Sequence, residues 1–272
     1  MAVLVADKRA RFRKLHEAGC FIIPNPWDVG SARVLQALGF QALATTSSGF
    51  AWSRGGLDNQ TPIGDMLAHF AELSAAVDLP INADFENGFG DAPEDVAANV
   101  TRALATGVAG LSIEDQAHDA AKSLYEAALA VERMRAARAA MDADGTGAVL
   151  VGRAEGRLGD RAPLAAVLDR LATLADAGAD CLYAPGLRTA DEIAEAVKAV
   201  APKPLNVLVS TPGFSRAALA DLGVRRISVG GGLARVAWGA AIKAARAMAE
   251  DGSFEGFAGA ATGGDMQGLL GS

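Results

Sequence analysis

Three acidic residues of this chain lie in otherwise apolar segments. Asp84 and Glu86 are two positions apart in the segment 81–86, and Glu114 follows the run that begins at Gly110. A carboxylate in such surroundings is unfavourable unless it is paired or binds a metal ion. Mg²⁺ prefers oxygen ligands and keeps several waters, so a few carboxylates suit it better than histidine or cysteine. The acids therefore predict a Mg²⁺ site, with Mn²⁺ as an alternative ion; salt bridges to arginine or lysine are the competing interpretation.

Arg153 is the candidate partner of an anionic substrate. Its planar guanidinium could hold a carboxylate through two hydrogen bonds, or it could form an ion pair with Glu155 or Glu86. The segment 47–49 (SSG) is a second candidate, because backbone N–H groups of small residues can approach an anion closely. The same segment could also be a simple turn.

Short apolar runs alternate with longer Ala- and Leu-rich stretches of helical period, which is the pattern of repeated βα units. We therefore expect one α/β domain over residues 1–272, a (β/α)8 TIM barrel with an extra helix at about 7–17 and a helical C-terminal tail. The length would also allow two domains, but no linker divides the sequence. The eight expected strands are 21–25, 42–47, 81–86, 110–115, 149–155, 181–185, 205–210 and 226–230.

In such a barrel the carboxyl ends of the strands meet at one face, where active sites are built. Five consecutive expected strands end there in polar residues. Asp84 and Glu86 should point to the same side of their strand because side chains alternate. His118, on the loop after the fourth strand, could act as a general acid, cover the site or be solvated. His16 and His69 lie on expected helices and are predicted to be packing or surface residues.

The composition excludes several kinds of partner. The net charge is −7 and no cluster of Lys and Arg occurs, so neither nucleic acid nor a membrane is expected to bind. We expect a cytoplasmic protein, because no segment has the length of a membrane span and the first residues lack the apolar core of a signal peptide. The two cysteines, Cys20 and Cys181, lie in apolar runs and are expected to be buried and unpaired.

Six segments, in order, resemble the isocitrate lyase/phosphoenolpyruvate mutase superfamily, from about residue 20 to residue 240. The resemblance implies a TIM barrel whose last helix is swapped between subunits, usually in a homotetramer built as a dimer of dimers. It also implies Mg²⁺-dependent chemistry on a small 2-oxo acid or its enol form, through an enolate that the metal stabilises. The segments are 25–32 (NPWDVGSA), 47–49 (SSG), 84–90 (DFENGFG), 112–116 (SIEDQ), 152–155 (GRAE) and 223–230 (GVRRISVG).

The resemblance also implies roles for individual residues. Asp84 would be the direct Mg²⁺ ligand, with three other acids holding metal-bound waters. The substrate carboxylate would be held by Arg153 and by the backbone at Ser47, Ser48 and Gly49. The other acids are Asp58, Glu86 and Glu114; the further candidate substrate contacts are Trp27, Asp28 and Asn206; the candidate catalytic residues are Arg153, His118 and Lys122.

The chain departs from the family pattern in the loop 116–124 (QAHDAAKSL). The family's lyases have a cysteine there that protonates the leaving group, and its mutases have a Lys-Thr-Asn-Ser motif; this loop has neither. The segment 184–186 (APG) also lacks a glutamate that lyases of larger tricarboxylates often have. We therefore expect a lyase that cleaves a carbon–carbon bond in, or decarboxylates, an oxaloacetate-like substrate. Two alternatives stay open: carbon–phosphorus chemistry of the phosphonopyruvate hydrolase or phosphoenolpyruvate mutase type, and 2-oxo acid binding without catalysis.

Overall fold

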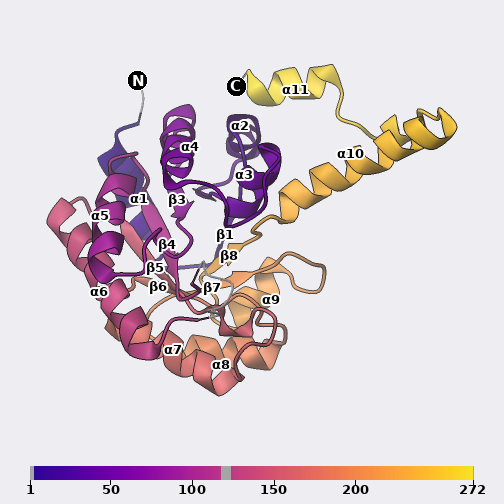
Figure 1. Cartoon of the computed structure of the whole chain (residues 1–272). Helices are drawn as coiled ribbons and strands as arrows, with labels where there is room; N and C mark the ends of the chain where they lie inside the picture. Colours follow the sequence, from indigo (N-terminus) through magenta and orange to yellow (C-terminus); the bar gives the residue numbers. More distant parts are fainter. Residues whose placement is uncertain (1–2, 118–123, 272) are drawn as a thin grey trace.

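The computed structural model describes residues 3–117 and 124–271, which form a barrel of parallel strands surrounded by helices (Figure 1). The strands follow the order β1-β8-β7-β6-β5-β4-β3-β2, and the Ala44 N–H bridges the remaining seam by donating to the Pro24 carbonyl at 3.0 Å. The predicted TIM barrel is confirmed, with every strand shorter than expected at its carboxyl end. The strands are β1 (Phe21–Ile23), β2 (Leu43–Ala44), β3 (Ile81–Asp84), β4 (Gly110–Glu114), β5 (Val149–Arg153), β6 (Cys181–Tyr183), β7 (Leu205–Leu208) and β8 (Arg226–Ser228).

Side chains along each strand alternate between two buried layers. In β4, Leu111 and Ile113 belong to the core between sheet and helices, whereas Ser112 faces the barrel interior. In β8, Ile227 packs outward and Arg226 lies inside. Because both layers are buried, the strands appear in the sequence as nearly continuous apolar runs.

Helices cover the outside of the barrel (Figure 1). Pro93 starts α5 at its first turn, and Val96, Val100 and Leu104 of that helix are buried. Each such side chain contributes about 2 kcal/mol by leaving water. The outer helices are α2 (Val29–Ala37), α3 (Ser47–Ser53), α4 (Ile63–Ala76), α5 (Pro93–Leu104), α6 (Ala127–Asp144), α7 (Leu164–Asp176), α8 (Ala190–Val200) and α9 (Arg216–Asp221), with a 3-10 turn η1 (Glu155–Arg157).

Helix α1 (Val5–Leu15) closes the amino-terminal end of the barrel, close to the range predicted for an extra helix. Its Phe12 is fully buried among inward-facing strand residues. Gly110 makes room for this ring, because a Cβ there would lie 2.8 Å from Phe12. Arg9 anchors the helix by donating to the carbonyls of Leu104 and Val108 at 2.8 and 2.9 Å. The plug leaves the carboxyl-end face as the open end of the barrel.

The C-terminal tail is helical, as predicted, but α10 (Gly232–Asp251) projects away from the barrel (Figure 1). After the turn η2 (Glu255–Phe257), α11 (Gly263–Leu270) lies beside α2. Val236, Trp238 and Ile242 of α10 are exposed, Val236 by 71%. Among the described residues, no helix has both the length and the apolar character that a membrane crossing requires.

The two histidines with described positions, His16 and His69, are packing residues, in agreement with the sequence. The His69 ring stacks on Phe50 with 3.9 Å between ring centres, and His16 makes an edge contact with Phe12 at 4.7 Å. Burial lowers the pKa of His69 to about 4 and that of His16 to about 3. Both rings are therefore neutral in the folded protein near pH 7.

The lowered pKa of His69 predicts a loss of stability in mild acid. Between pH 6.5 and about 4 the unfolded state holds a proton at this ring that the folded state does not, so the free energy of unfolding falls as the pH falls. From pH 7 to pH 5 we expect a loss of about 2 kcal/mol from His69. The variant His69→Phe keeps a ring stacked on Phe50. In urea denaturation, its free energy of unfolding should fall between pH 7 and pH 5 by about 2 kcal/mol less than that of wild type. His16 contributes equally in both proteins. An identical loss in both proteins would contradict the prediction.

Candidate active site

A pocket of about 230 Å³ opens at the carboxyl ends of the strands, where barrel enzymes place their active sites. Its wall combines an acid and a base, Asp84 and Arg153, with small residues such as Ala44 that leave space inside the barrel. Its polar lining residues are Asn25, Thr45, Thr46, Ser47, Ser48, Asp58, Asn82, Asp84, Ser112, Arg153, Tyr183, Arg226 and Ser228.

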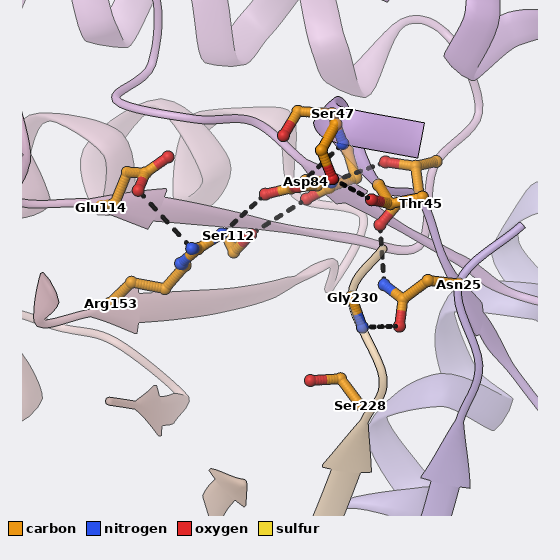
Figure 2. A network of polar contacts seen from close by, with 12 residues as sticks. Asn25, Thr45, Ser47, Asp84, Ser112, Glu114, Arg153, Ser228 and Gly230 are labelled. Atoms are coloured by element: carbon orange, nitrogen blue, oxygen red, sulfur yellow. Dashed lines mark hydrogen bonds and ion pairs between the residues drawn. The ribbon is translucent and has the colours of Figure 1, made fainter. Parts of the chain in front are cut away.

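Asp84, the last residue of β3, is held from two sides (Figure 2). Its Oδ2 accepts a hydrogen bond from the Ser47 N–H at 3.0 Å, and its Oδ1 accepts one from Arg153 Nη1 at 2.7 Å. Its own N–H donates to Thr45 Oγ1 at 2.8 Å. These bonds join the ends of β2, β3 and β5 and fix the direction of the carboxylate in the pocket wall.

Arg153, the last residue of β5, contacts three carboxylates. In addition to Asp84, its Nε donates to Glu155 Oε1 at 2.8 Å and its Nη2 lies 3.5 Å from Glu114 Oε2. Burial lowers the pKa of Arg153, but these carboxylates outweigh burial and raise it well above its usual value. The ion pair with Glu155, which was the alternative interpretation of Arg153, is thus present. Because the guanidinium also lines the pocket, its contact with a substrate carboxylate stays a prediction.

The site contains more acidic than basic side chains. Asp84, Glu86 and Glu155 lie within electrostatic reach of Glu114, and Arg153 is the cation that contacts Asp84, Glu114 and Glu155. Burial raises the pKa of Glu114, Arg153 opposes the rise, and the other three acids add to it. A hard divalent cation would balance this charge, and all the donors are carboxylate oxygens, which Mg²⁺ prefers.

The donor geometry fits an ion that keeps most of its waters. Within residues 3–117 and 124–271, no three His, Cys, Asp or Glu side chains are close enough to hold a metal by themselves. Mg²⁺ is commonly held by one or two carboxylates while water fills its other positions. Asp84 and Asp58 are the two acids that line the pocket, and the direct bond from Asp84 to the ion, with the other acids holding its waters, stays a prediction.

Asp58 and Glu86 are the outer members of the predicted metal set. Asp58 is exposed at the pocket rim, where partial loss of hydration and the Asp84 carboxylate raise its pKa. Glu86 is buried and lies beyond the end of β3 with a φ of +46°. The strand ends at Asp84, so the argument from side-chain alternation was wrong for Glu86. A turn places it instead, and its carbonyl accepts from the Glu114 N–H at 2.9 Å.

The segment 47–49 begins α3 and is not an extended strand end. The Thr46 side chain caps the helix by accepting from the Gly49 N–H at 3.3 Å, while the Ser47 N–H donates to Asp84. Gly49 is needed for packing, because a Cβ there would lie 2.7 Å from Thr46 Cγ2. Ser47 and Ser48 line the pocket and Gly49 does not. Two of the three backbone donors predicted to hold the substrate are therefore engaged within the protein.

Three other predicted substrate contacts lie outside the pocket wall. Asp28 caps α2, with its Oδ1 accepting from the Ser31 N–H at 2.7 Å. Trp27 is half-buried and packs beside Gly49, where an added Cβ would lie 3.0 Å from the Trp27 Cβ. Asn206 is fully buried and donates to Ser228 Oγ at 3.0 Å. In this structure Asp28 therefore caps a helix, Trp27 packs beside α3, and Asn206 supports a residue of the pocket lining.

The predicted catalytic residues His118 and Lys122 lie outside the described residues. The two ends of their loop are anchored, since Gln116 forms an antiparallel bridge with Leu124. The Tyr125 N–H donates to the Asp115 carbonyl at 2.8 Å, and Arg170 Nη1 donates to the Asp115 carboxylate at 2.9 Å. Asp115, which follows Glu114 in sequence, therefore serves this anchor rather than the pocket.

Eight of the polar lining residues were not among the predicted site residues, and two of these, Asn25 and Tyr183, connect neighbouring parts of the site. Asn25 accepts from the N–H groups of Val229 and Gly230, both at 2.9 Å, and donates to the Thr45 carbonyl at 2.8 Å, which ties β8 to β2 across the barrel seam (Figure 2). Tyr183 ends β6 with its ring centre 4.9 Å from the Arg153 guanidinium carbon. Applying side-chain alternation to every expected strand would have identified Tyr183 as an inward residue.

The fold and the site define a class of protein: a TIM-barrel enzyme with an acidic pocket at its open end. The model of the phosphoenolpyruvate phosphomutase family matches residues 12–249, so the chain belongs to this family. The resemblance to the phosphoenolpyruvate mutase/isocitrate lyase superfamily is thereby confirmed.

Relatives of known structure or activity agree with this membership. A Burkholderia cenocepacia protein described only as a lyase/mutase is 45% identical with a TM-score of 0.94, over 98% of this chain and 97% of that one. A 2-methylisocitrate lyase of Halalkalibacterium halodurans is 28% identical over 80% of this chain and 74% of its own length. Oxaloacetate acetylhydrolase, solved with its product oxalate, is 26% identical with a TM-score of 0.86, over 98% of this chain and 94% of that one. These relatives support assigning the chain to the lyases.

Proposed function

We propose that this protein is a Mg²⁺-dependent lyase that cleaves a carbon–carbon bond in, or decarboxylates, a small oxaloacetate-like 2-oxo acid. The observation that supports this most directly is the acidic pocket itself, in which Asp84 and Arg153 face a space of about 230 Å³. That space suits a molecule of a few carbon atoms. The similarity to oxaloacetate acetylhydrolase, whose structures contain oxalate and 3,3-difluorooxaloacetate, agrees with such a substrate.

The positions of the two thiols favour a reaction without a cysteine acid. Cys20 precedes β1 and Cys181 is the first residue of β6, so both lie toward the amino-terminal end of the strands. Burial raises the pKa of Cys181 to about 11. Neither thiol lines the pocket. A lyase step that needs a thiol to protonate the leaving group therefore lacks its donor.

The residues of the pocket divide the work of binding and orientation. Arg153 would hold the substrate carboxylate, and the Ser47 and Ser48 hydroxyls lie beside it in the wall. Burial raises the pKa of Tyr183, so its phenol stays protonated and can donate a hydrogen bond. Mg²⁺ at Asp84 would supply positive charge to the keto and carboxylate oxygens and so stabilise a developing enolate.

The proposal predicts metal-dependent turnover of oxaloacetate without any contribution from a thiol. We expect activity with Mg²⁺, none with EDTA, and a rate within about twofold of wild type in the double variant Cys20→Ser/Cys181→Ala, since neither residue touches the pocket. The assay should follow loss of the enol absorbance of oxaloacetate together with formation of pyruvate or oxalate. Full activity in EDTA would contradict the proposal.

The same assay separates the two alternatives. Release of phosphate from phosphonopyruvate without turnover of oxaloacetate would show carbon–phosphorus chemistry. A rise in melting temperature with oxalate and Mg²⁺, but no product from any of these compounds, would show a binding protein.

We also propose that the chain forms a homotetramer in which α10 is exchanged between subunits. The support is α10 itself, which stands clear of its own barrel and exposes Val236, Trp238 and Ile242. Single-chain exposure of this kind is unfavourable and marks an interaction surface. Light scattering should give the mass of four chains, and Trp238→Asp should lower it, whereas a monomeric wild type would contradict the proposal.

A further inference from the structure

The barrel interior below the active site is unusually polar. Barrel interiors are normally filled by branched apolar side chains. Here Asn82, Ser112, Asn206, Arg226 and Ser228 face the interior, and each of them is at least 95% buried. Between the Phe12 plug and the mouth there is thus a polar floor, and four of these five residues line the same pocket as Asp84.

Arg226 is the only charged side chain of this floor. Its guanidinium carbon lies 5.9 Å from the centre of the Phe12 ring, and its Nη1 reaches Asn82 Oδ1 at 3.4 Å. Within residues 3–117 and 124–271, its Nε has no hydrogen-bond partner and no carboxylate lies within ion-pair distance. Arg153 shows the opposite situation, because three carboxylates contact it.

A buried cation without an anionic partner is unfavourable by itself, so Arg226 requires an explanation. Burial lowers its pKa and the Asp84 carboxylate, beyond ion-pair distance, opposes this only in part, whereas the carboxylates that contact Arg153 raise the pKa of that residue. Arg226 is also in the pocket wall, and an anion entering at the mouth can therefore reach it. Its neighbours Asn82 and Ser228 are neutral, so the single charge of Arg226 matches an anion of one charge better than a doubly charged phosphonate. A guanidinium matches a planar carboxylate in shape.

We propose that Arg226 binds the distal carboxylate of the substrate and so selects 2-oxo dicarboxylates over 2-oxo monocarboxylates. The inference rests on the proposed function. The substrate then spans the pocket, with its 2-oxo acid end at Asp84 and Arg153 and its second carboxylate at the floor. Arg226 is a specificity-determining residue in this arrangement.

The test compares two ligands of the same site by calorimetry with Mg²⁺ present. 3,3-Difluorooxaloacetate carries the second carboxylate and pyruvate does not. Wild type should bind the dicarboxylate more tightly. Arg226→Gln should weaken dicarboxylate binding about 30-fold or more and change pyruvate binding less than about threefold, because it leaves one carboxylate without its cation. Arg226→Lys should recover part of the loss, and Arg225→Gln, which alters a side chain bonded to the Gly19 carbonyl outside the pocket, should match wild type.

Four results would overturn the inference. Equal weakening of both ligands in Arg226→Gln would show a structural role, and melting temperatures of all variants would reveal it. If wild type binds pyruvate as tightly as the dicarboxylate, the proposed selection of dicarboxylates is refuted, while the proposed function stays intact. Tighter, Arg226-dependent binding of phosphonopyruvate would show that the floor takes a phosphonate. If neither ligand binds wild type with Mg²⁺, the proposed function fails, and this inference fails with it.

Discussion

Replacing Asp84 with asparagine is expected to lower metal-dependent turnover by at least about 10³-fold, equivalent to about 4 kcal/mol of transition-state stabilisation. The substitution keeps the size of the side chain and an oxygen for the Ser47 N–H, but it removes the negative charge that would attract Mg²⁺. The rise in melting temperature caused by Mg²⁺ should disappear as well. Measuring both quantities separates lost metal binding from misfolding.

Asp65→Asn is the matched control for Asp84→Asn. Asp65 lies in α4, in the outer layer of the barrel, where it pairs with Arg54 at 3.1 Å and does not line the pocket. Exposed pairs of this kind contribute roughly 0–1 kcal/mol, so turnover and the Mg²⁺ effect should be unchanged. If the Asp84→Asn variant still turns over substrate in a Mg²⁺-dependent manner, Asp84 is not part of the metal site.

Arg153→Gln is expected to destabilise the metal-free protein by about 3–5 kcal/mol, because it leaves buried carboxylates without their cation. Glu155 is 1% exposed in its side chain and Glu114 10%, so water cannot replace the guanidinium fully. Mg²⁺ should then stabilise the variant more than it stabilises wild type, because the ion would replace the cation that these carboxylates have lost. Urea denaturation with and without Mg²⁺ measures both effects.

The control for this second experiment is Arg188→Gln. Arg188 pairs with Asp160 at 3.1 Å, but its side chain is 59% exposed, so its loss should change the free energy of unfolding by less than about 1 kcal/mol. If Mg²⁺ stabilises Arg153→Gln no more than wild type, the acidic residues around Arg153 do not hold the ion. If Arg153→Gln is as stable as wild type without metal, the carboxylates are protonated and the charge argument is wrong.

Local patterns in the sequence were sufficient to predict the barrel. Apolar runs between helical stretches located every strand, because strands buried on both faces must be apolar throughout. Asp84, Glu114 and Arg153 were recognisable for the related reason that a charge in such a run is unfavourable without a partner. Their position at strand ends then followed from the geometry of parallel barrels.

What the sequence could not provide was the partner of each polar group. Gly49 reads as part of an anion-binding segment, yet its N–H caps a helix through Thr46, and Asp28 caps α2 instead of touching the pocket. These choices are made by competing local hydrogen bonds whose geometry depends on where a strand ends. β2 and β3 each end earlier than expected, so Ser47 begins α3 and Glu86 lies in a turn.

The sequence by itself determined the fold class, the superfamily and the acids of the open end, since these follow from periodicity and from residue types at strand ends. Only the tertiary structure decided how the charges are shared. Among the residues that the structure describes, it placed three carboxylates on Arg153 and none within ion-pair distance of Arg226, although both arginines line one pocket. The reason is that such contacts join distant parts of the chain: Arg153 and Asp84 are 69 residues apart, and Arg226 and Asn82 are 144 apart.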